Sequence, residues 1–274
     1  MHSFVTADMS LRDRIGIDMG DRMPVLEAVE WASEHDVRFL DVTLERRLED
    51  GLEDDASAIR AACASGDVHL GLHPSSAVNM AETAPIVSGA TDEYLLAYID
   101  AAQTLGAEWI VVHGGYHFTA DVDKRFDASM SRLATAVDRA AEVDVSLLLE
   151  NHNPEPDRAE VHYIPASPSE CHRYFDRFDA SRLGWAFNPP HANLHELGIE
   201  GFQDELDVAR CGEVRLNDNR GDQEEHLPPG DGEIDFAGLF DRLEPHYDGH
   251  YTLAFGTPEA MLEGREYLLE VANG

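Results

Sequence analysis

Short apolar runs alternate with longer amphipathic stretches along the whole chain. Runs such as Trp109–Val112 and Val145–Leu149 are apolar at almost every position, which is typical of strands buried on both faces of a parallel sheet. We predict eight such strands, over Arg14–Asp18, Arg38–Thr43, Val68–Leu72, Trp109–His113, Ser146–Glu150, Leu183–Phe187, Glu213–Asn217 and Tyr251–Phe255.

The stretches between the strands carry signals for helix starts and stops. Thr91 is a candidate N-cap, and Gly106 marks the C-terminal end of the same helix. Proline opens other helices, because its missing N–H costs no hydrogen bond at the first helical position. The predicted helices run from Pro24 to about His35, over Asp92–Leu105, Phe126–Val143, Ser169–Phe178 and Phe236–Leu243, and from Pro258 to about Val271.

This order of elements predicts the α/β class and, within it, a (β/α)8 TIM barrel. Eight strand–helix repeats over 274 residues match a closed barrel, which typically needs about 250 residues. An open doubly wound sheet shows the same alternation and is the alternative, but Met19–Pro24 after the first strand lacks its GxGxxG turn. No linker divides the chain, so we expect one barrel domain over residues 1–274.

The charge balance is strongly acidic, with 54 Asp and Glu against 20 Lys and Arg and a formal net charge of −34. Such a field repels the phosphates of nucleic acids and anionic lipids, so we expect no nucleic-acid partner. An acidic surface suits a protein that stays soluble in concentrated salt, where self-repulsion is screened. We therefore expect a halophilic setting.

The three cysteines, Cys63, Cys171 and Cys211, have no CxxC spacing, which argues against a disulfide framework or a zinc ribbon. No basic segment followed by an apolar run opens the chain, and no stretch approaches the roughly 18 apolar residues of a membrane span. We expect a cytoplasmic protein without a membrane partner.

Polar residues follow several of the predicted strands, at the barrel end where catalytic sites lie. His73, His113 and Glu150 end neighbouring strands, and parallel strands aim these ends at one small area. The three side chains are of metal-ligand type, so they are expected to share a site. Isolated histidines are more often hydrogen-bonded structural residues. We give that interpretation to His117, His152 and His195.

The motifs that contain these residues resemble the xylose isomerase-like superfamily, which includes sugar-phosphate isomerases and epimerases and endonuclease IV repair enzymes. The resemblance rests on His73-Pro-Ser-Ser, Ile-Val-Val-His113-Gly-Gly, Leu-Leu-Glu150-Asn, Asn188-Pro-Pro-His191-Ala-Asn and His226-Leu-Pro-Pro-Gly-Asp-Gly. It covers nearly the whole chain and implies a barrel whose site lies at the C-terminal ends of its strands.

The resemblance also implies a divalent ion held by a Glu, an Asp, a His and a Glu after successive strands. Only the first of these is present here, as Glu150, while Asn188, Arg215 and Ala254 occupy the other positions. An Arg beside an ion would repel it. A metal, Zn, Mn or Mg, would then be held by His73, His113, Glu150 and His191, or be absent.

Endonuclease IV-like enzymes bind a cluster of zinc ions through further residues. His73, His113 and His191 match that pattern, and Glu224 with His226 falls near another of its ligand pairs. The set His191, Glu224 and His226 is therefore a second candidate zinc site. DNA cleavage also needs a basic surface, so a metal-dependent hydrolase of this kind is the least favoured alternative.

These residues favour a sugar or sugar-phosphate isomerase or epimerase that transfers a proton next to a carbonyl. Glu150 is the candidate base, and Arg215 could replace the ion by stabilising an enediolate or binding an anionic group. The candidate substrate-binding residues are Asn188, His191, Asn217 and His226. A non-catalytic barrel that binds a small polyol is the alternative from another class. Related barrels are often dimers or tetramers, but the sequence itself carries no signal for a homo-oligomer.

Overall fold

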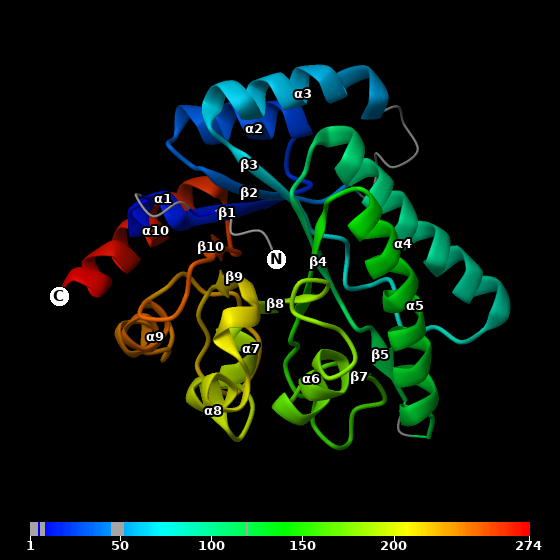
Figure 1. Cartoon of the computed structure of the whole chain (residues 1–274). Helices are drawn as coiled ribbons and strands as arrows, with labels where there is room; N and C mark the ends of the chain where they lie inside the picture. The colour runs from blue at the N-terminus through cyan, green and yellow to red at the C-terminus, as the bar shows by residue number, and fades with distance from the viewer. Residues whose placement is uncertain (1–4, 6–8, 45–51, 119) are drawn as a thin grey trace.

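Eight parallel strands close into a barrel, and helices surround it (Figure 1). The computed structural model describes residue 5 and residues 9–44, 52–118 and 120–274. The barrel strands are β1 (Ile15–Gly20), β2 (Phe39–Val42), β3 (His69–Leu72), β4 (Trp109–Val112), β6 (Ser146–Glu150), β8 (Gly184–Phe187), β9 (Cys211–Leu216) and β10 (His250–Leu253).

The strand order around the barrel is β1-β10-β9-β8-β6-β4-β3-β2. The first and last strands pair in parallel, with Ile15 opposite Tyr251 and Ile17 opposite Leu253, and this pairing closes the sheet. The predicted barrel is therefore confirmed, and the open doubly wound sheet is excluded. Each of the eight predicted strand ranges overlaps a barrel strand.

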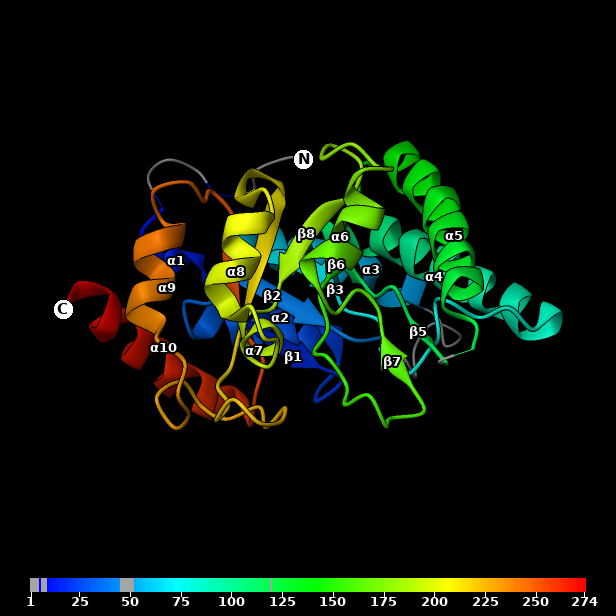
Figure 2. The ribbon, with the colours of Figure 1, turned by 90° about the horizontal axis from the view of Figure 1, so that it is seen from below.

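Helices follow most strands and cover the outside of the barrel (Figure 1). They are α1 (Leu11–Arg14), α2 (Val25–Glu34), α3 (Leu52–Gly66), α4 (Pro85–Leu105), α5 (Val122–Glu142), α6 (Pro168–Phe175), α7 (Pro189–Asn193), α8 (Gly198–Glu205), the 3-10 turn η1 (Val208–Arg210), α9 (Phe236–Leu243) and α10 (Pro258–Asn273). Two short strands, β5 (Tyr116–His117) and β7 (His162–Tyr163), pair outside the barrel (Figure 2). Within the described ranges, no helix combines the length and apolarity needed to cross a bilayer.

Several predicted boundaries differ from the structure, among them the start of α5 at Val122 instead of Phe126, and two of the differences have a clear cause. Arg14 belongs to α1 rather than to the first strand, because Ser10 and Asp13 form a capping box that starts a helical turn there. Thr91 does not cap α4, which begins before it, at Pro85. The Thr91 hydroxyl instead donates to the carbonyl of Val87 inside the helix, at 3.0 Å.

A small apolar cluster includes Phe39 and Trp109, the first residues of β2 and β4. Gly16 on β1 allows β2 to pack closely, since a Cβ at this position would lie 2.1 Å from the backbone oxygen of Phe39. A backbone oxygen within a sheet cannot move aside easily. The absence of a side chain at residue 16 is therefore a condition for the β1–β2 contact.

Gly16→Ala is expected to destabilise the protein by about 3 kcal/mol, because the clash must shift a central strand. Gly89→Ala is the matched control, since Gly89 lies in α4 and its added Cβ would have no heavy atom within 4 Å. That change should raise stability by roughly 0.5–1 kcal/mol through helix propensity. Urea unfolding of both variants measures the effects, and equal effects would contradict the packing argument.

Candidate functional site

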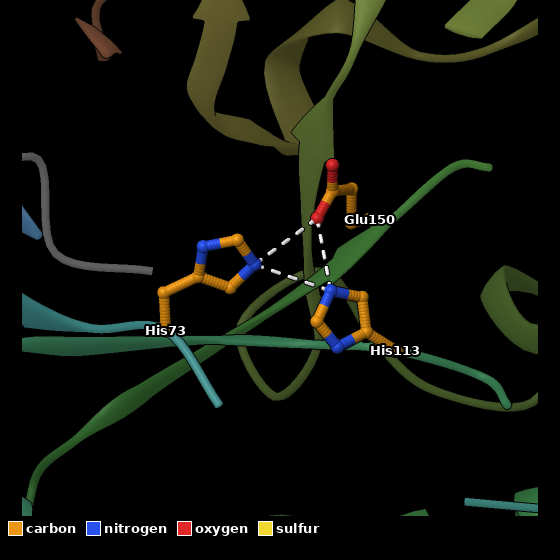
Figure 3. A group of neighbouring side chains, drawn as sticks. All are labelled: His73, His113 and Glu150. Carbon is orange, nitrogen blue, oxygen red and sulfur yellow. Dashed lines mark hydrogen bonds and ion pairs between the residues drawn. The ribbon is translucent and has the colours of Figure 1, made fainter. Parts of the chain in front are cut away.

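Three metal-ligand-type side chains meet at the C-terminal ends of neighbouring strands. His73 follows β3, His113 follows β4 and Glu150 ends β6. The His113 Nε2 lies 3.1 Å from the Glu150 Oε2, and the His73 Nε2 lies 3.2 Å from the His113 Nε2. The His73 Nε2 is 3.5 Å from the same carboxylate oxygen. Figure 3 shows all three side chains pointing toward one another, as the sequence predicted.

Glu150 is buried, and its carboxylate has several hydrogen-bonding and charged partners. Its Oε2 faces both histidines, while its Oε1 accepts a hydrogen bond from the Asn188 Nδ2 at 2.7 Å. The Arg215 Nε lies 3.8 Å from Oε1. Burial raises the pKa of this carboxyl, but the hydrogen bonds of His113 and His73 and the charge of Arg215 outweigh it and hold the pKa well below its ordinary range. Glu150 is therefore ionised at neutral pH.

The two histidines differ in their pKa values. The His73 Nδ1 is 3.0 Å from the Asp18 Oδ2. Burial and Arg215 lower the pKa of His73, but the contacts with Asp18 and Glu150 outweigh both and raise it to about 9. Burial is the main cause that lowers the pKa of His113 below its ordinary value. His73 is thus the charged partner of Glu150, and His113 is neutral.

Arg215 lies beneath these residues, 2% exposed, at the centre of a group of acids. Its Nη1 contacts the Glu213 Oε1 at 2.6 Å and the Asp41 Oδ2 at 2.8 Å, and its Nη2 pairs with Asp18. Burial opposes the charge, but Glu213, Asp18 and Glu150 outweigh it and raise the pKa of Arg215 well above its ordinary value. One guanidinium therefore holds several buried carboxylates together.

The acids around Arg215 outnumber its single positive charge, and two of them have raised pKa values. Burial, together with Glu213, raises the pKa of Asp41 to about 7. Burial is also the main cause that raises the pKa of Glu213. Asp41 and Glu213 lie inside strands whose other residues are mostly apolar. The sequence pattern therefore did not identify them as site residues.

The group His73, His113 and Glu150 fits a divalent ion of the zinc type. One ligand atom from each residue lies within 4.8 Å of those of the other two. Two imidazole nitrogens and one carboxylate oxygen form a donor set that zinc accepts, with a position left for water or substrate. The contact between Asp18 and His73 orients the His73 ring, as carboxylates do at zinc sites when they bind the ring nitrogen that does not face the ion.

The four positions at which the resemblance places metal ligands do not fit an ion. Glu150 is the one carboxylate among them, Asn188 offers a neutral amide, and Ala254 offers no ligand atom. At the remaining position, Arg215 presents a positive charge. A second candidate group, Asp18, Asp41 and His73, has its carboxylates bound to that guanidinium.

His191, Glu224 and His226 form the other side of the site. The His191 Nε2 is 2.8 Å from the Glu224 Oε1, and the His226 Nε2 is 3.3 Å from the same oxygen. Asn188 caps α7 by accepting from the backbone N–H of His191 at 3.1 Å. Burial lowers the pKa of His191, but Glu224 and Glu150 outweigh it and raise the pKa above its ordinary value. His191 therefore lies between the two groups: its Nε2 pairs with Glu224, and its Nδ1 is 3.8 Å from the Glu150 Oε1.

These residues line one cavity of about 700 Å³. It lies at the C-terminal ends of the barrel strands, which we call the barrel mouth. All the sequence-predicted site residues line it: His73, His113, Glu150, Asn188, His191, Arg215, Asn217, Glu224 and His226. The Oδ1 of Asn217 is buried and accepts no hydrogen bond from the described part of the chain.

The cavity is also lined by residues that the sequence pattern did not identify as site residues. Asp18 and Arg22, from the end of β1 and the turn after it, both line the wall. Asp18 ends a predicted strand, so its position was a usable signal. Arg22 lies in a turn, where the strand pattern carries no information.

The three histidines interpreted as structural have different environments. His195 accepts from the backbone N–H of Leu197 at 3.1 Å, which is a local turn contact. His117 is buried in β5 and stacks on His162. His152, in contrast, lines the cavity and stacks on His191 with ring centroids 5.7 Å apart.

Comparisons with known proteins agree with this fold. The model of a family described as xylose isomerase-like TIM barrel matches residues 29–271. An uncharacterized protein of Methanocaldococcus jannaschii is 29% identical over 217 residues, which cover 76% of this chain and 72% of that protein.

Two solved structures are similar over almost their full length. The crystal structure of a D-tagatose 3-epimerase-like protein has a TM-score of 0.80 at 24% identity and covers 95% of this chain and 98% of its own. That of D-psicose 3-epimerase from Clostridium cellulolyticum H10, with D-tagatose, has a TM-score of 0.76 at 14% identity and the same coverage. At these identities the likeness shows the fold.

Proposed function

Because the chain belongs to the xylose isomerase-like TIM barrel family, we propose that it is a sugar isomerase or epimerase that transfers a proton next to a carbonyl. The observation that carries the proposal is Glu150, an ionised carboxylate at the barrel mouth with a cavity in front of it. The sugar epimerases among the similar structures support the same substrate class. Fold alone would not justify this step, since one barrel hosts many chemistries.

In this proposal Glu150 accepts the proton from the carbon beside the substrate carbonyl. Asn188 holds the other carboxylate oxygen at 2.7 Å and so fixes the orientation of the base. The free Oδ1 of Asn217 accepts from a sugar hydroxyl, and His191 and His226 bind further hydroxyls at the rim. Arg215 stabilises negative charge near Glu150 from below.

A divalent ion, if bound, would be held by His73, His113 and Glu150. It would supply Lewis acid chemistry, polarising the carbonyl of the substrate. Without it, the protonated His73 and Arg215 supply the positive charge on this side of the cavity. The proposal therefore has a metal-dependent and a metal-independent form.

Zinc binding separates these two forms. We expect one zinc per chain after loading and dialysis, and a His113→Ala variant should bind it at least about tenfold more weakly. His195→Ala is the matched control, because that ring lies outside the group and should leave affinity unchanged. Elemental analysis and competition with a chromogenic chelator measure both. Protein that retains no zinc under any loading condition would exclude the metal-dependent form.

Solvent exchange tests the function itself. Ketoses and their phosphates are incubated with the protein in D2O, and NMR follows deuterium entering the carbon next to the carbonyl. We expect exchange with at least one sugar. A non-catalytic polyol-binding barrel, which the residues Asn188, Arg215 and Ala254 favour, would instead bind a sugar without any exchange. A DNA substrate is disfavoured by the net charge of −34.

A further inference from the structure

Arg22 is a fixed cation at the rim of the cavity. Its Nη1 donates to the backbone oxygens of Asp18 and Met19 at 3.2 and 2.9 Å, and its Nη2 donates to that of Gly256 at 3.1 Å. These carbonyls come from the ends of β1 and from the segment after β10. Arg22 is solvent-exposed, and these hydrogen bonds hold its guanidinium between the two strand ends.

The charge of Arg22 has no acidic partner within the part of the chain that the structure describes. All its hydrogen bonds in that part go to neutral carbonyls, which leaves its Nε–H and one N–H of Nη2 without an acceptor there. Arg215 is the other arginine of the cavity wall, and it forms ion pairs with buried carboxylates. Arg22 is thus the cavity arginine whose charge is open to a ligand.

Arg22 and Glu150 lie on opposite sides of the mouth. In the order β1-β10-β9-β8-β6-β4-β3-β2, the strand β6 is four places from β1 in either direction. Both residues line the same cavity of about 700 Å³, a size that holds a small extended ligand. A ligand whose reacting carbon lies at Glu150 would place its far end near Arg22.

We propose that Arg22 binds an anionic group, a phosphate or a carboxylate, at the end of the substrate remote from the reacting carbon. This proposal rests on the proposed function for the position of that carbon. The planar guanidinium offers paired N–H donors that match the oxygens of either group. The net charge of −34 repels anions, so a local cation is needed to bind one. The substrate class is then a sugar phosphate or a sugar acid.

Binding of charged and neutral sugars tests this assignment by calorimetry. D-fructose 6-phosphate, D-fructuronate and D-fructose are compared, with inorganic phosphate as a competitor. We expect one of the two anions to bind at least about tenfold more tightly than D-fructose, and Arg22→Gln to abolish that difference. Arg22→Lys should retain part of it. Arg182→Gln, which removes an exposed arginine paired with Asp138, is the control and should change nothing.

The outcomes separate this proposal from the proposed function. A preference for the phosphate or for the carboxylate identifies the anionic group. Equal affinity for all three sugars, or an anion preference that survives in Arg22→Gln, would overturn the role of Arg22 even if deuterium exchange occurs. Arg22-dependent anion binding without exchange would instead support the subsite and count against the isomerase. Unfolding curves of Arg22→Gln establish that the variant is folded.

Discussion

Arg215→Met is expected to lower the free energy of unfolding by about 3–5 kcal/mol, because it leaves buried carboxylates without their positive partner. Arg215 contacts Asp18, Asp41 and Glu213, and each of these acids is largely or fully buried. Methionine keeps much of the volume of the arginine side chain. The lowered free energy of unfolding would therefore result from the lost positive charge and not from a cavity. Urea unfolding at pH 7 measures it.

The pH dependence of this variant gives a second signature. Carboxyls without a cation have their folded-state pKa raised, as that of Asp41 already is, to about 7. The folded state then binds more protons than the unfolded state between about pH 4 and pH 7, so stability falls as pH rises through this window. The loss of unfolding free energy caused by Arg215→Met should therefore become smaller as the pH is lowered toward 5.

Arg182→Met is the matched control for both measurements. Arg182 pairs with Asp138 on the surface, and exposed pairs contribute roughly 0–1 kcal/mol. The loss of unfolding free energy in Arg182→Met should be small at every pH. If Arg215→Met were as stable as this control, the buried acids would be neutral in the folded protein and the role of Arg215 as their counter-ion would be wrong.

The barrel was predictable from the sequence because each strand is short, continuous and apolar. Runs such as Trp109–Val112 are buried on both faces in the structure, as the pattern required. The closure of the sheet followed from the number of repeats. Helix starts were harder, because Thr91 carries a cap signal that the longer helix from Pro85 overrides.

The mouth residues were predictable for a different reason. A polar side chain directly after an apolar run marks a strand end, and His73, His113 and Glu150 all have that position. The acids below them do not. Asp41 and Glu213 interrupt apolar strands, and their partner Arg215 is distant in sequence from Asp41, so the pairing exists only once the barrel closes.

Glu150→Gln is expected to reduce deuterium exchange by about a thousandfold, since a general base contributes roughly 10²–10⁴ to such a step. Glutamine has nearly the same shape and can still accept from Asn188, but it cannot take up the proton. The loss should appear in zinc-loaded and in metal-stripped protein alike, because in both forms of the proposal Glu150 is the base.

Glu108→Gln is the control for this change. The Glu108 carboxylate also pairs with a histidine, with its Oε1 2.8 Å from the His69 Nδ1, but it precedes β4 and so lies at the opposite end of the barrel. Exchange in this variant should equal that of the parent protein. Full exchange activity in Glu150→Gln would show that another group removes the proton. His191 with Glu224 would then be the next candidate, because this pair lines the same cavity and is independently hydrogen-bonded.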